Sequence, residues 1–146
     1  MTYSVLIIDD HPLFARGLSQ LIETQKDYKV TGIAKNHDEA IELLKELSPD
    51  LAIVDLNLGQ EDGLELIKDI LSIKAQTKVL VLSMHDERYY ADRALKAGAK
   101  GYIMKEEAET NVSTAINTVM QGQIYLSQKE MKRQQELIKG QNHKSE

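Results

Sequence analysis

Cysteine is absent from this sequence of 146 residues. Its absence excludes disulfide bonds, thiol nucleophiles, and zinc or iron–sulfur sites with cysteine ligands. Long apolar runs are absent too, since none approaches the roughly 20 residues that a helix needs to cross a bilayer. The chain also begins without the basic stretch of a secretion signal. We therefore expect a cytoplasmic protein that does not contact a membrane and whose chemistry uses oxygen and nitrogen groups.

Basic residues are outnumbered by acidic ones. The chain has 18 Lys and Arg against 23 Asp and Glu, for a formal net charge of -5. Binding to a phosphate backbone depends on clustered Lys and Arg, so we expect no DNA binding by this chain alone. A hydrophobic fraction of 42% over this length fits one compact domain.

Short apolar runs alternate with stretches in which apolar residues follow a helical period. Four of the five runs are nearly continuous in Val, Ile and Leu, as expected for parallel strands buried on both faces. The run that begins near Tyr28 is more polar and suits a sheet edge. The predicted strands are residues 5–8, 30–34, 51–54, 79–82 and 102–104.

The stretches between these runs carry the start and stop signals of helices. Pro12 suits a first helical turn, Asn36 with Glu39 forms a capping box, and Gly98 suits a helix end. The alternation predicts an α/β fold, because strand–helix–strand connections are right-handed. We expect a flavodoxin-like (CheY-like), doubly wound sheet of five parallel strands in the order 2-1-3-4-5.

The pattern changes after Gly122. We assign residues 1–122 to one domain and residues 123–146 to a C-terminal linker. The linker is polar and has almost no apolar face, so we predict weak packing, partial helix, and disorder over residues 140–146. Ser127 with Glu130 is a candidate cap for such a helix.

Polar side chains stand at the ends of four predicted strands. Asp9 and Asp10 follow the first strand, Asp55 the third, Ser83 the fourth and Lys105 the fifth. In an open α/β sheet, ligands bind at the carboxyl ends of the strands, where the strand order reverses. We therefore expect these five side chains to form one site.

Three carboxylates at one edge repel one another unless a cation lies between them. The oxygen-rich set favours Mg²⁺, since His11 and His37 lack a recognisable metal-ligand spacing. A carboxylate beside Mg²⁺ and a lysine is a competent nucleophile for phosphorus, because the cations withdraw charge from the phosphoryl oxygens. Asp55 stands alone at the end of the central strand and is the predicted nucleophile.

These motifs together resemble a known family. They are Asp9-Asp10, Asp55-Leu56-Asn57, Leu82-Ser83 and the Gly-Tyr-Ile-Met-Lys stretch that ends at Lys105. The sequence resembles the receiver domain of bacterial two-component response regulators over roughly residues 3–121. Within that superfamily, residues 101–106 and 122–127 look most like the NarL/FixJ-type (LuxR-class) transcription regulators.

The resemblance implies a role for each acidic residue. Asp55 is the expected phosphoacceptor, and its phosphoryl group comes from a phosphohistidine on a sensor histidine kinase. Asp10 is expected to contact Mg²⁺ directly, and Asp9 mostly through water. The main-chain carbonyl of Asn57 completes the expected metal ligands.

The resemblance also implies a switch. Ser83 and Tyr102 are the expected switch pair, in which the hydroxyl moves toward the phosphoryl group and the ring turns inward. Lys105 is the expected phosphate-binding lysine. The implied output is phosphorylation-dependent homodimerisation, with DNA bound by an effector domain that residues 123–146 are too short to contain.

Two other functions use similar residues. A phosphatase of the haloacid dehalogenase type also has an Asp nucleophile, Mg²⁺, Ser or Thr, and Lys. Its rapid turnover needs a second acid two residues after the nucleophile. Here that residue is Asn57, whose amide cannot shuttle a proton, and the candidate nucleophile Asp55 lies on the third predicted strand instead of the first. We therefore predict a signalling phosphoacceptor with at most slow turnover and not an enzyme.

A pseudo-receiver or a flavin-binding module is the second alternative. A flavin site needs a phosphate-binding loop rich in Ser, Thr and Gly after the first strand. The sequence there is Asp-Asp-His-Pro, so we expect no organic cofactor. Structural explanations also exist for single residues: Asp9 and Asp10 as caps of the following helix, Ser83 as a loop residue, and Tyr102 as an edge aromatic with its hydroxyl in water.

Overall fold

Five parallel strands form the centre of the protein, in the order β2-β1-β3-β6-β7. The structure is a computed structural model and describes residues 2–59 and 61–144. The strands are β1 (Tyr3–Ile8), β2 (Tyr28–Ala34), β3 (Leu51–Asp55), β6 (Lys78–Ser83) and β7 (Gly101–Met104). The helices are α1 (Pro12–Glu23), α2 (His37–Leu47), α3 (Gly63–Ile73), α4 (Glu87–Ala97), the short 3-10 helix η1 (Lys105–Glu107), α5 (Ala108–Met120) and α6 (Gln128–Lys144).

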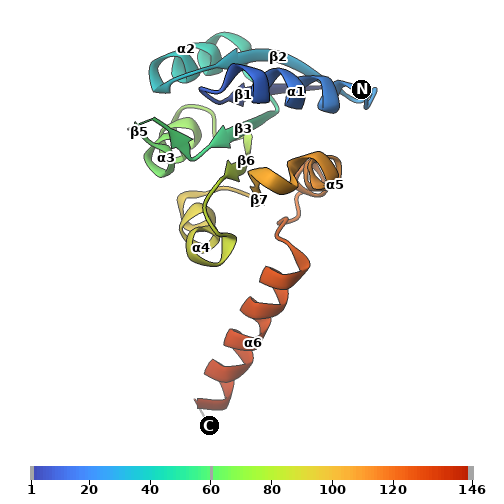
Figure 1. Cartoon of the computed structure of the whole chain (residues 1–146). Coiled ribbons are helices and arrows are strands. Elements are labelled where there is room, and N and C mark those ends of the chain that lie inside the picture. The colour runs from blue at the N-terminus through green and yellow to red at the C-terminus, as the bar shows by residue number, and fades with distance from the viewer. Residues whose placement is uncertain (1, 60, 145–146) are drawn as a thin grey trace.

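Both faces of the sheet are covered by helices (Figure 1). Along β1, Val5 and Ile7 pack into a core with α1 and α5, whereas Leu6 and Ile8 pack into a core with α2, α3 and α4. Successive side chains of a strand point to opposite faces. The continuous apolar runs of the sequence therefore reflect burial on both faces, and the predicted fold and strand order are confirmed.

The helix signals identified in the sequence also act as expected. Pro12 is the first residue of α1, and the Asn36 side chain accepts a hydrogen bond from the Glu39 backbone N–H. Gly98 ends α4 with a φ of 115°, a left-handed conformation that glycine adopts without strain. Local signals thus set these helix ends.

A small hairpin was not predicted. The two-residue strands β4 (Asn57–Leu58) and β5 (Glu61–Asp62) pair in antiparallel fashion between β3 and α3. Two residues are too few to show a sequence period. The hairpin fixes the path of the chain directly after Asp55.

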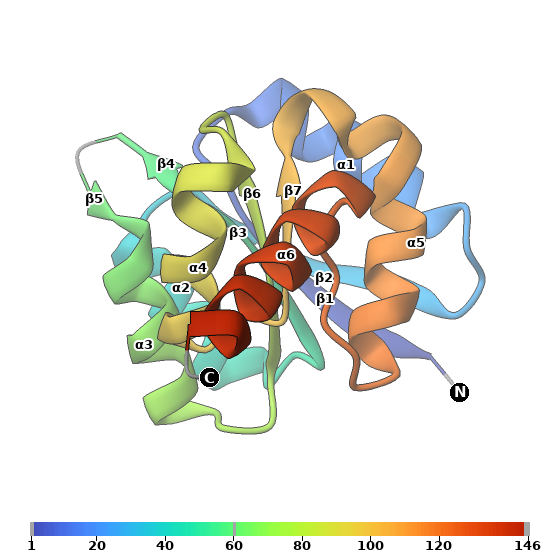
Figure 2. The ribbon, with the colours of Figure 1, turned by 90° about the horizontal axis from the view of Figure 1, so that it is seen from below.

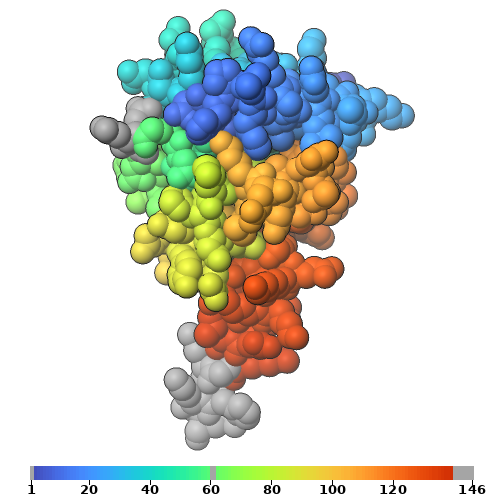
Figure 3. Space-filling view, in the orientation of Figure 1, coloured from blue at the N-terminus to red at the C-terminus, as the bar shows by residue number. Residues whose placement is uncertain are grey.

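The segment after α5 follows the outer edge of the sheet before it turns into α6. Tyr125 donates its backbone N–H to the Lys100 carbonyl at 2.9 Å, and its carbonyl accepts from Tyr102 N at 3.1 Å. In the view from below, α6 lies in front of β7 and beside α4 (Figure 2). It projects from the rest of the molecule (Figure 3). α6 continues to Lys144, residues 145–146 lie outside the described residues, and the disorder predicted for residues 140–146 stays a prediction.

None of the helices in the described ranges combines the length and the hydropathy that a membrane span requires.

Candidate functional site

The predicted site residues lie together at the carboxyl edge of β1, β3, β6 and β7. Asp9 and Asp10 follow β1, Asp55 ends β3, Ser83 ends β6, and Lys105 follows β7. These four strands are neighbours in the sheet. Residues far apart in the sequence therefore meet at one edge because the strands are parallel and in register.

The Lys105 ammonium lies between two buried carboxylates. Its Nζ donates a hydrogen bond to Asp55 Oδ2 at 2.9 Å and lies 3.1 Å from Asp9 Oδ2. Asp55 and Asp9 are 0% and 2% exposed. The ammonium lies 4.4 Å from the centroid of the Phe14 ring, a cation–π contact. Because buried carboxylates are costly without a counter-ion, Lys105 is a necessary part of this pocket.

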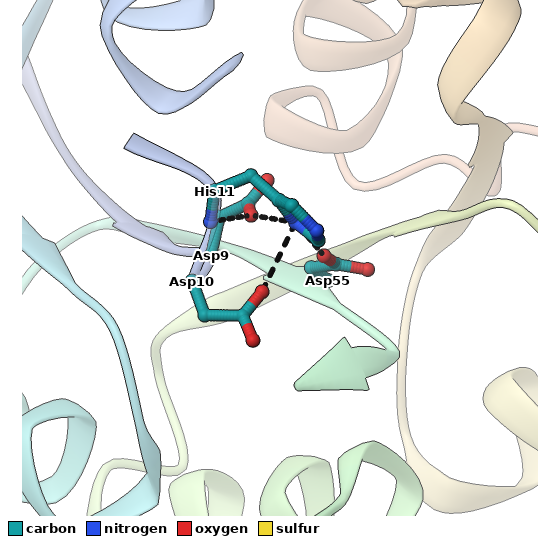
Figure 4. A group of neighbouring side chains, drawn as sticks. All are labelled: Asp9, Asp10, His11 and Asp55. Atoms are coloured by element: carbon teal, nitrogen blue, oxygen red, sulfur yellow. Dashed lines mark hydrogen bonds and ion pairs between the residues drawn. The ribbon is translucent and has the colours of Figure 1, made fainter. Parts of the chain in front are cut away.

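His11 belongs to the pocket, which its sequence spacing did not indicate. Its Nδ1 lies 3.0 Å from Asp10 Oδ1, 3.1 Å from Asp9 Oδ1 and 3.7 Å from Asp55 Oδ2 (Figure 4). Its side chain is nevertheless 55% exposed. The available signal was its position directly after Asp9 and Asp10, since a residue at the start of a helix can fold back onto the strand end.

The acidic residues do not serve as helix caps. The N-cap of α1 is His11, and no side chain makes a capping hydrogen bond there. Asp9 Oδ1 accepts the His11 backbone N–H at 2.8 Å. Asp9 and Asp10 therefore face the pocket, and the capping alternative for them is not supported.

Two oxygens of the pocket are still available to a ligand. Asp9 Oδ2 and Asp10 Oδ1 are buried and accept no hydrogen bond among the described residues, although Lys105 and His11 approach them at ion-pair distance. One ligand atom from each of Asp9, Asp10, His11 and Asp55 lies within 4.8 Å of the others. Opposite ligands of an octahedral Mg²⁺ are about 4.2 Å apart. The acidic pocket is therefore compact enough to bind a metal ion.

The side chain of Asn57 joins two loops at the rim of the pocket. Its Oδ1 accepts from Met84 N at 3.1 Å and from Ser83 Oγ at 3.4 Å, and its Nδ2 lies 2.9 Å from His85 Nε2. The Asn57 backbone N–H donates to Asp55 Oδ1 at 2.8 Å. The amide thus ties the segment after β3 to the segment after β6. That the Asn57 main-chain carbonyl ligates the metal stays a prediction.

Ser83 and Tyr102 are connected through one residue. Ser83 Oγ accepts the His85 backbone N–H at 2.9 Å, and the Tyr102 hydroxyl donates to the His85 carbonyl at 2.9 Å. Tyr102 is fully buried. Burial raises the pKa of its hydroxyl to about 12, so it remains a donor at neutral pH. The alternative of an edge aromatic with its hydroxyl in water is therefore wrong, and the ring already points inward in this arrangement.

A hollow of about 320 Å³ opens beside the pocket. It is lined by Phe14, Ser83, Met84, Met104, Lys105 and Glu106. Met84 is 70% exposed and flanks this opening. The hollow therefore leads from solvent toward the Lys105 ammonium, which is 10% exposed, and the buried Ser83.

Comparison with known families and proteins gives a consistent result. A family model for the response regulator receiver domain matches residues 5–117. The transcriptional regulatory protein DegU of Brevibacillus brevis is 34% identical over 125 residues, which are 86% of this chain and 53% of DegU. The nitrate/nitrite response regulator protein NarL of Escherichia coli K12 is also 34% identical over 125 residues, covering 86% of this chain and 58% of NarL. The chain thus spans between half and three fifths of these relatives.

Solved structures agree in fold. A two-component response regulator of the LuxR family from Aurantimonas sp. SI85-9A1 superposes with a TM-score of 0.84 at 30% identity, covering 90% of this chain and 94% of the other. The isolated REC domain of RcsB from Salmonella enterica serovar Typhimurium also gives a TM-score of 0.84, at 26% identity, covering 92% of this chain and 99% of the other.

Proposed function

The chain belongs to the response regulator receiver domain family, and on that premise we propose that Asp55 accepts a phosphoryl group with Mg²⁺ bound in the acidic pocket. The NarL and LuxR relatives identify it as the receiver domain of a two-component response regulator. The observation that carries the proposal is the Lys105 ammonium, held 2.9 Å from Asp55 Oδ2 and 3.1 Å from Asp9 Oδ2.

The transfer is a displacement at phosphorus. An Asp55 carboxylate oxygen forms the new bond to phosphorus while the bond to the donor breaks, and the donor group leaves with its electron pair. Lys105 balances the charge on one phosphoryl oxygen, and the Ser83 hydroxyl donates to another. Bound Mg²⁺ supplies further positive charge at the phosphoryl oxygens. The residues therefore stabilise both the transfer and the aspartyl phosphate that it forms.

The pocket oxygens support the choice of metal. Asp9 and Asp10 offer buried oxygens that accept no hydrogen bond in the described part of the chain. Mg²⁺ prefers oxygen ligands and retains several waters, which suits an open pocket with few protein ligands. Asp10, Asp9 and the main-chain carbonyl of Asn57 are the ligands that we propose, together with Asp55.

Slow turnover is part of the proposal. Rapid hydrolysis of an aspartyl phosphate needs a general acid and base beside it. The residue two positions after Asp55 is Asn57, whose amide contacts Met84 and His85. An amide cannot act as a general acid or base at neutral pH. The aspartyl phosphate therefore persists as a signal, and the chain acts as a phosphoacceptor instead of a phosphatase.

Acetyl phosphate tests the proposal directly. With Mg²⁺ present, the intact mass of the protein is expected to rise by a single phosphoryl group, which peptide mapping assigns to the segment that contains Asp55. With EDTA in place of Mg²⁺, the expected gain is less than a tenth as large, because the carboxylates then repel the anionic donor. A gain that maps elsewhere, or the absence of any gain with Mg²⁺, contradicts the proposal.

A sensor histidine kinase is the physiological donor that we propose, docked on α1. Leu13 is 85% exposed, and a hollow of about 550 Å³ lies beside it between α1 and the start of α5. Leu13→Ala is expected to slow phosphotransfer from a kinase on the order of tenfold, which corresponds to a loss of about 1.4 kcal/mol of binding free energy. The rate with acetyl phosphate should not change. Ile33→Ala, an exposed apolar residue on β2, is the matched control, and equal losses in both variants would remove α1 as the docking surface.

The output that we propose is homodimerisation, with DNA bound by a segment outside this chain. The support is that the relative DegU is named as a transcriptional regulatory protein and that this chain spans little more than half of its length. Dimers place two DNA-binding units on symmetric sites. Sedimentation velocity is expected to show a shift toward twice the mass when beryllofluoride, a phosphoryl mimic, is added with Mg²⁺. The run is repeated with the protein concentration raised in steps up to about 100-fold. A mass distribution that beryllofluoride leaves unchanged at every protein concentration would contradict dimerisation.

A further inference from the structure

The buried carboxylate of Glu87 lies outside the acidic pocket and holds the start of α6. Glu87 is the first residue of α4 and is 7% exposed. Its Oε2 accepts the Ser127 backbone N–H at 2.8 Å, and its Oε1 accepts the Ser127 hydroxyl at 2.6 Å. We call these two hydrogen bonds the Glu87–Ser127 clamp. Hydrogen bonds to an ionised carboxylate are stronger than neutral ones.

The clamp also defines where α6 begins. Ser127 Oγ accepts the Glu130 backbone N–H at 3.1 Å, as an N-cap residue does. One hydroxyl therefore caps α6 and attaches it to α4. Loss of the clamp would free the first turn of α6 from the body of the protein.

Over the described side chains, the other hydrogen bonds between α6 and α4 are few. Gln134 Nε2 donates to Asp92 Oδ1 at 2.8 Å, and an Arg133 guanidinium nitrogen lies 3.4 Å from the Arg88 carbonyl. The apolar residues Leu137 and Ile138 are more than half exposed. Leu126, the residue before Ser127, is buried in the same core as Ala91 and Ala94 of α4. Because the later apolar residues of α6 stay exposed, the docking of the helix itself depends on the clamp more than on hydrophobic contact.

The clamp is connected to the phosphoryl-binding hydroxyl by a short segment. His85 N donates to Ser83 Oγ, and the His85 carbonyl accepts from the Tyr102 hydroxyl. Glu87 follows two residues later. In this arrangement Ser83 Oγ is held by His85 and Asn57. A Ser83 hydroxyl that turns to a phosphoryl oxygen must give up or lengthen these bonds, and residues 84–87 then lose an anchor.

Resting on the proposed role of Asp55, we propose that the Glu87–Ser127 clamp makes the docking of α6 on α4 depend on phosphorylation. When Ser83 binds the phosphoryl group, the segment after it shifts, the clamp opens and α6 is released from α4. Release changes the direction in which any following segment leaves the domain. A ligand shifts an equilibrium only through its different contacts in the two states, and here the different contacts are those of Ser83 Oγ.

Spin labels on α4 and α6 measure the docking. The sequence has no cysteine, so Lys96→Cys and Lys139→Cys place two labels without background labelling, at exposed positions outside the clamp. Pulsed dipolar spectroscopy of the full chain is expected to give one main distance. Addition of beryllofluoride with Mg²⁺ is expected to broaden it and move it to longer values. An unchanged distribution, while fluorine NMR shows bound beryllofluoride, overturns the coupling and leaves the proposed function standing.

Ser127→Ala tests the clamp itself. This variant removes the hydroxyl and is expected to give the broad distribution without any beryllofluoride. Because coupling is reciprocal, it is also expected to bind beryllofluoride about fivefold more tightly or better. Gln135→Glu, a charge change at an exposed position of α6 that does not line the hollow beside the clamp, is the control and should behave as the parent protein. The proposal is overturned if Ser127→Ala gives the same label-distance distribution as the parent protein and binds beryllofluoride with the same affinity.

The two proposals fail in different ways. If fluorine NMR shows no bound beryllofluoride, both the proposed phosphoryl site and its coupling to α6 are overturned. The label distances of Ser127→Ala then still report whether the clamp holds α6 on α4.

Discussion

Asparagine in place of Asp55 is expected to abolish phosphoryl uptake from acetyl phosphate. The amide oxygen and nitrogen are poor nucleophiles, and the pocket contains no other carboxylate at the end of β3. The Asn side chain keeps an oxygen that can accept the Asn57 N–H, which Asp55 Oδ1 accepts at 2.8 Å in the parent protein. We therefore expect a folded protein whose intact mass does not change with acetyl phosphate and Mg²⁺.

The control for this variant makes the same chemical change at an exposed site. Asp27 precedes β2 and is exposed, so Asp27→Asn should gain a phosphoryl group at the parent rate. Thermal unfolding of Asp55→Asn should show no loss of stability, because the substitution removes one of three carboxylates that repel each other. If Asp55→Asn gained mass as fast as Asp27→Asn, the nucleophile would have to be another residue.

Methionine in place of Lys105 is expected to slow phosphorylation by acetyl phosphate by about 100-fold. Removing one preorganised donor from a transition state costs about 2.7–4 kcal/mol, or a factor of 10² to 10³, and Mg²⁺ offsets part of the lost charge. The Lys105 ammonium contacts both Asp9 and Asp55. The measurement is the initial rate of mass gain at saturating Mg²⁺.

Lys100→Met is the matched control, because it removes the same charge from an exposed position just before β7. Its rate should stay within a factor of two of the parent rate, as expected for a charge beyond the screening length. Circular dichroism must show that Lys105→Met is folded, since the loss of a buried partner is destabilising. A folded Lys105→Met chain with the parent rate would contradict the role of this ammonium.

The sheet and most of the site could be predicted because each depends on a local signal. A strand buried on both faces must be apolar throughout, and the first, third and fourth strands satisfy that condition. Parallel strands then bring their carboxyl ends to one edge. Asp9, Asp55 and Lys105 could therefore be placed in one pocket from the sequence. In the structure the Lys105 ammonium lies within 3.1 Å of a carboxylate oxygen of both Asp9 and Asp55.

Other features could not be predicted because they depend on contacts between distant segments. The clamp joins Glu87 to Ser127, 40 residues later, and neither residue belongs to a sequence pattern that specifies the other. The ring of His11 turns toward the acids because of the chain direction at the start of α1, which composition does not reveal. The hydrophilic sequence of α6 predicted weak packing, yet Glu130 is 3% exposed because Arg133 and Gln134 satisfy its carboxylate.

The position of Lys105 late in the chain determines when the pocket is complete during folding. The ammonium follows β7, the last strand of the sheet, whereas the carboxylates it contacts follow β1 and β3. A chain still being synthesised, or one in which β7 has not paired with β6, has the acids but lacks their cation. If Asp55 accepts phosphoryl groups as we propose, copies in which β7 has not yet paired with β6 are expected to take up none, because they lack the ammonium that supports the transfer.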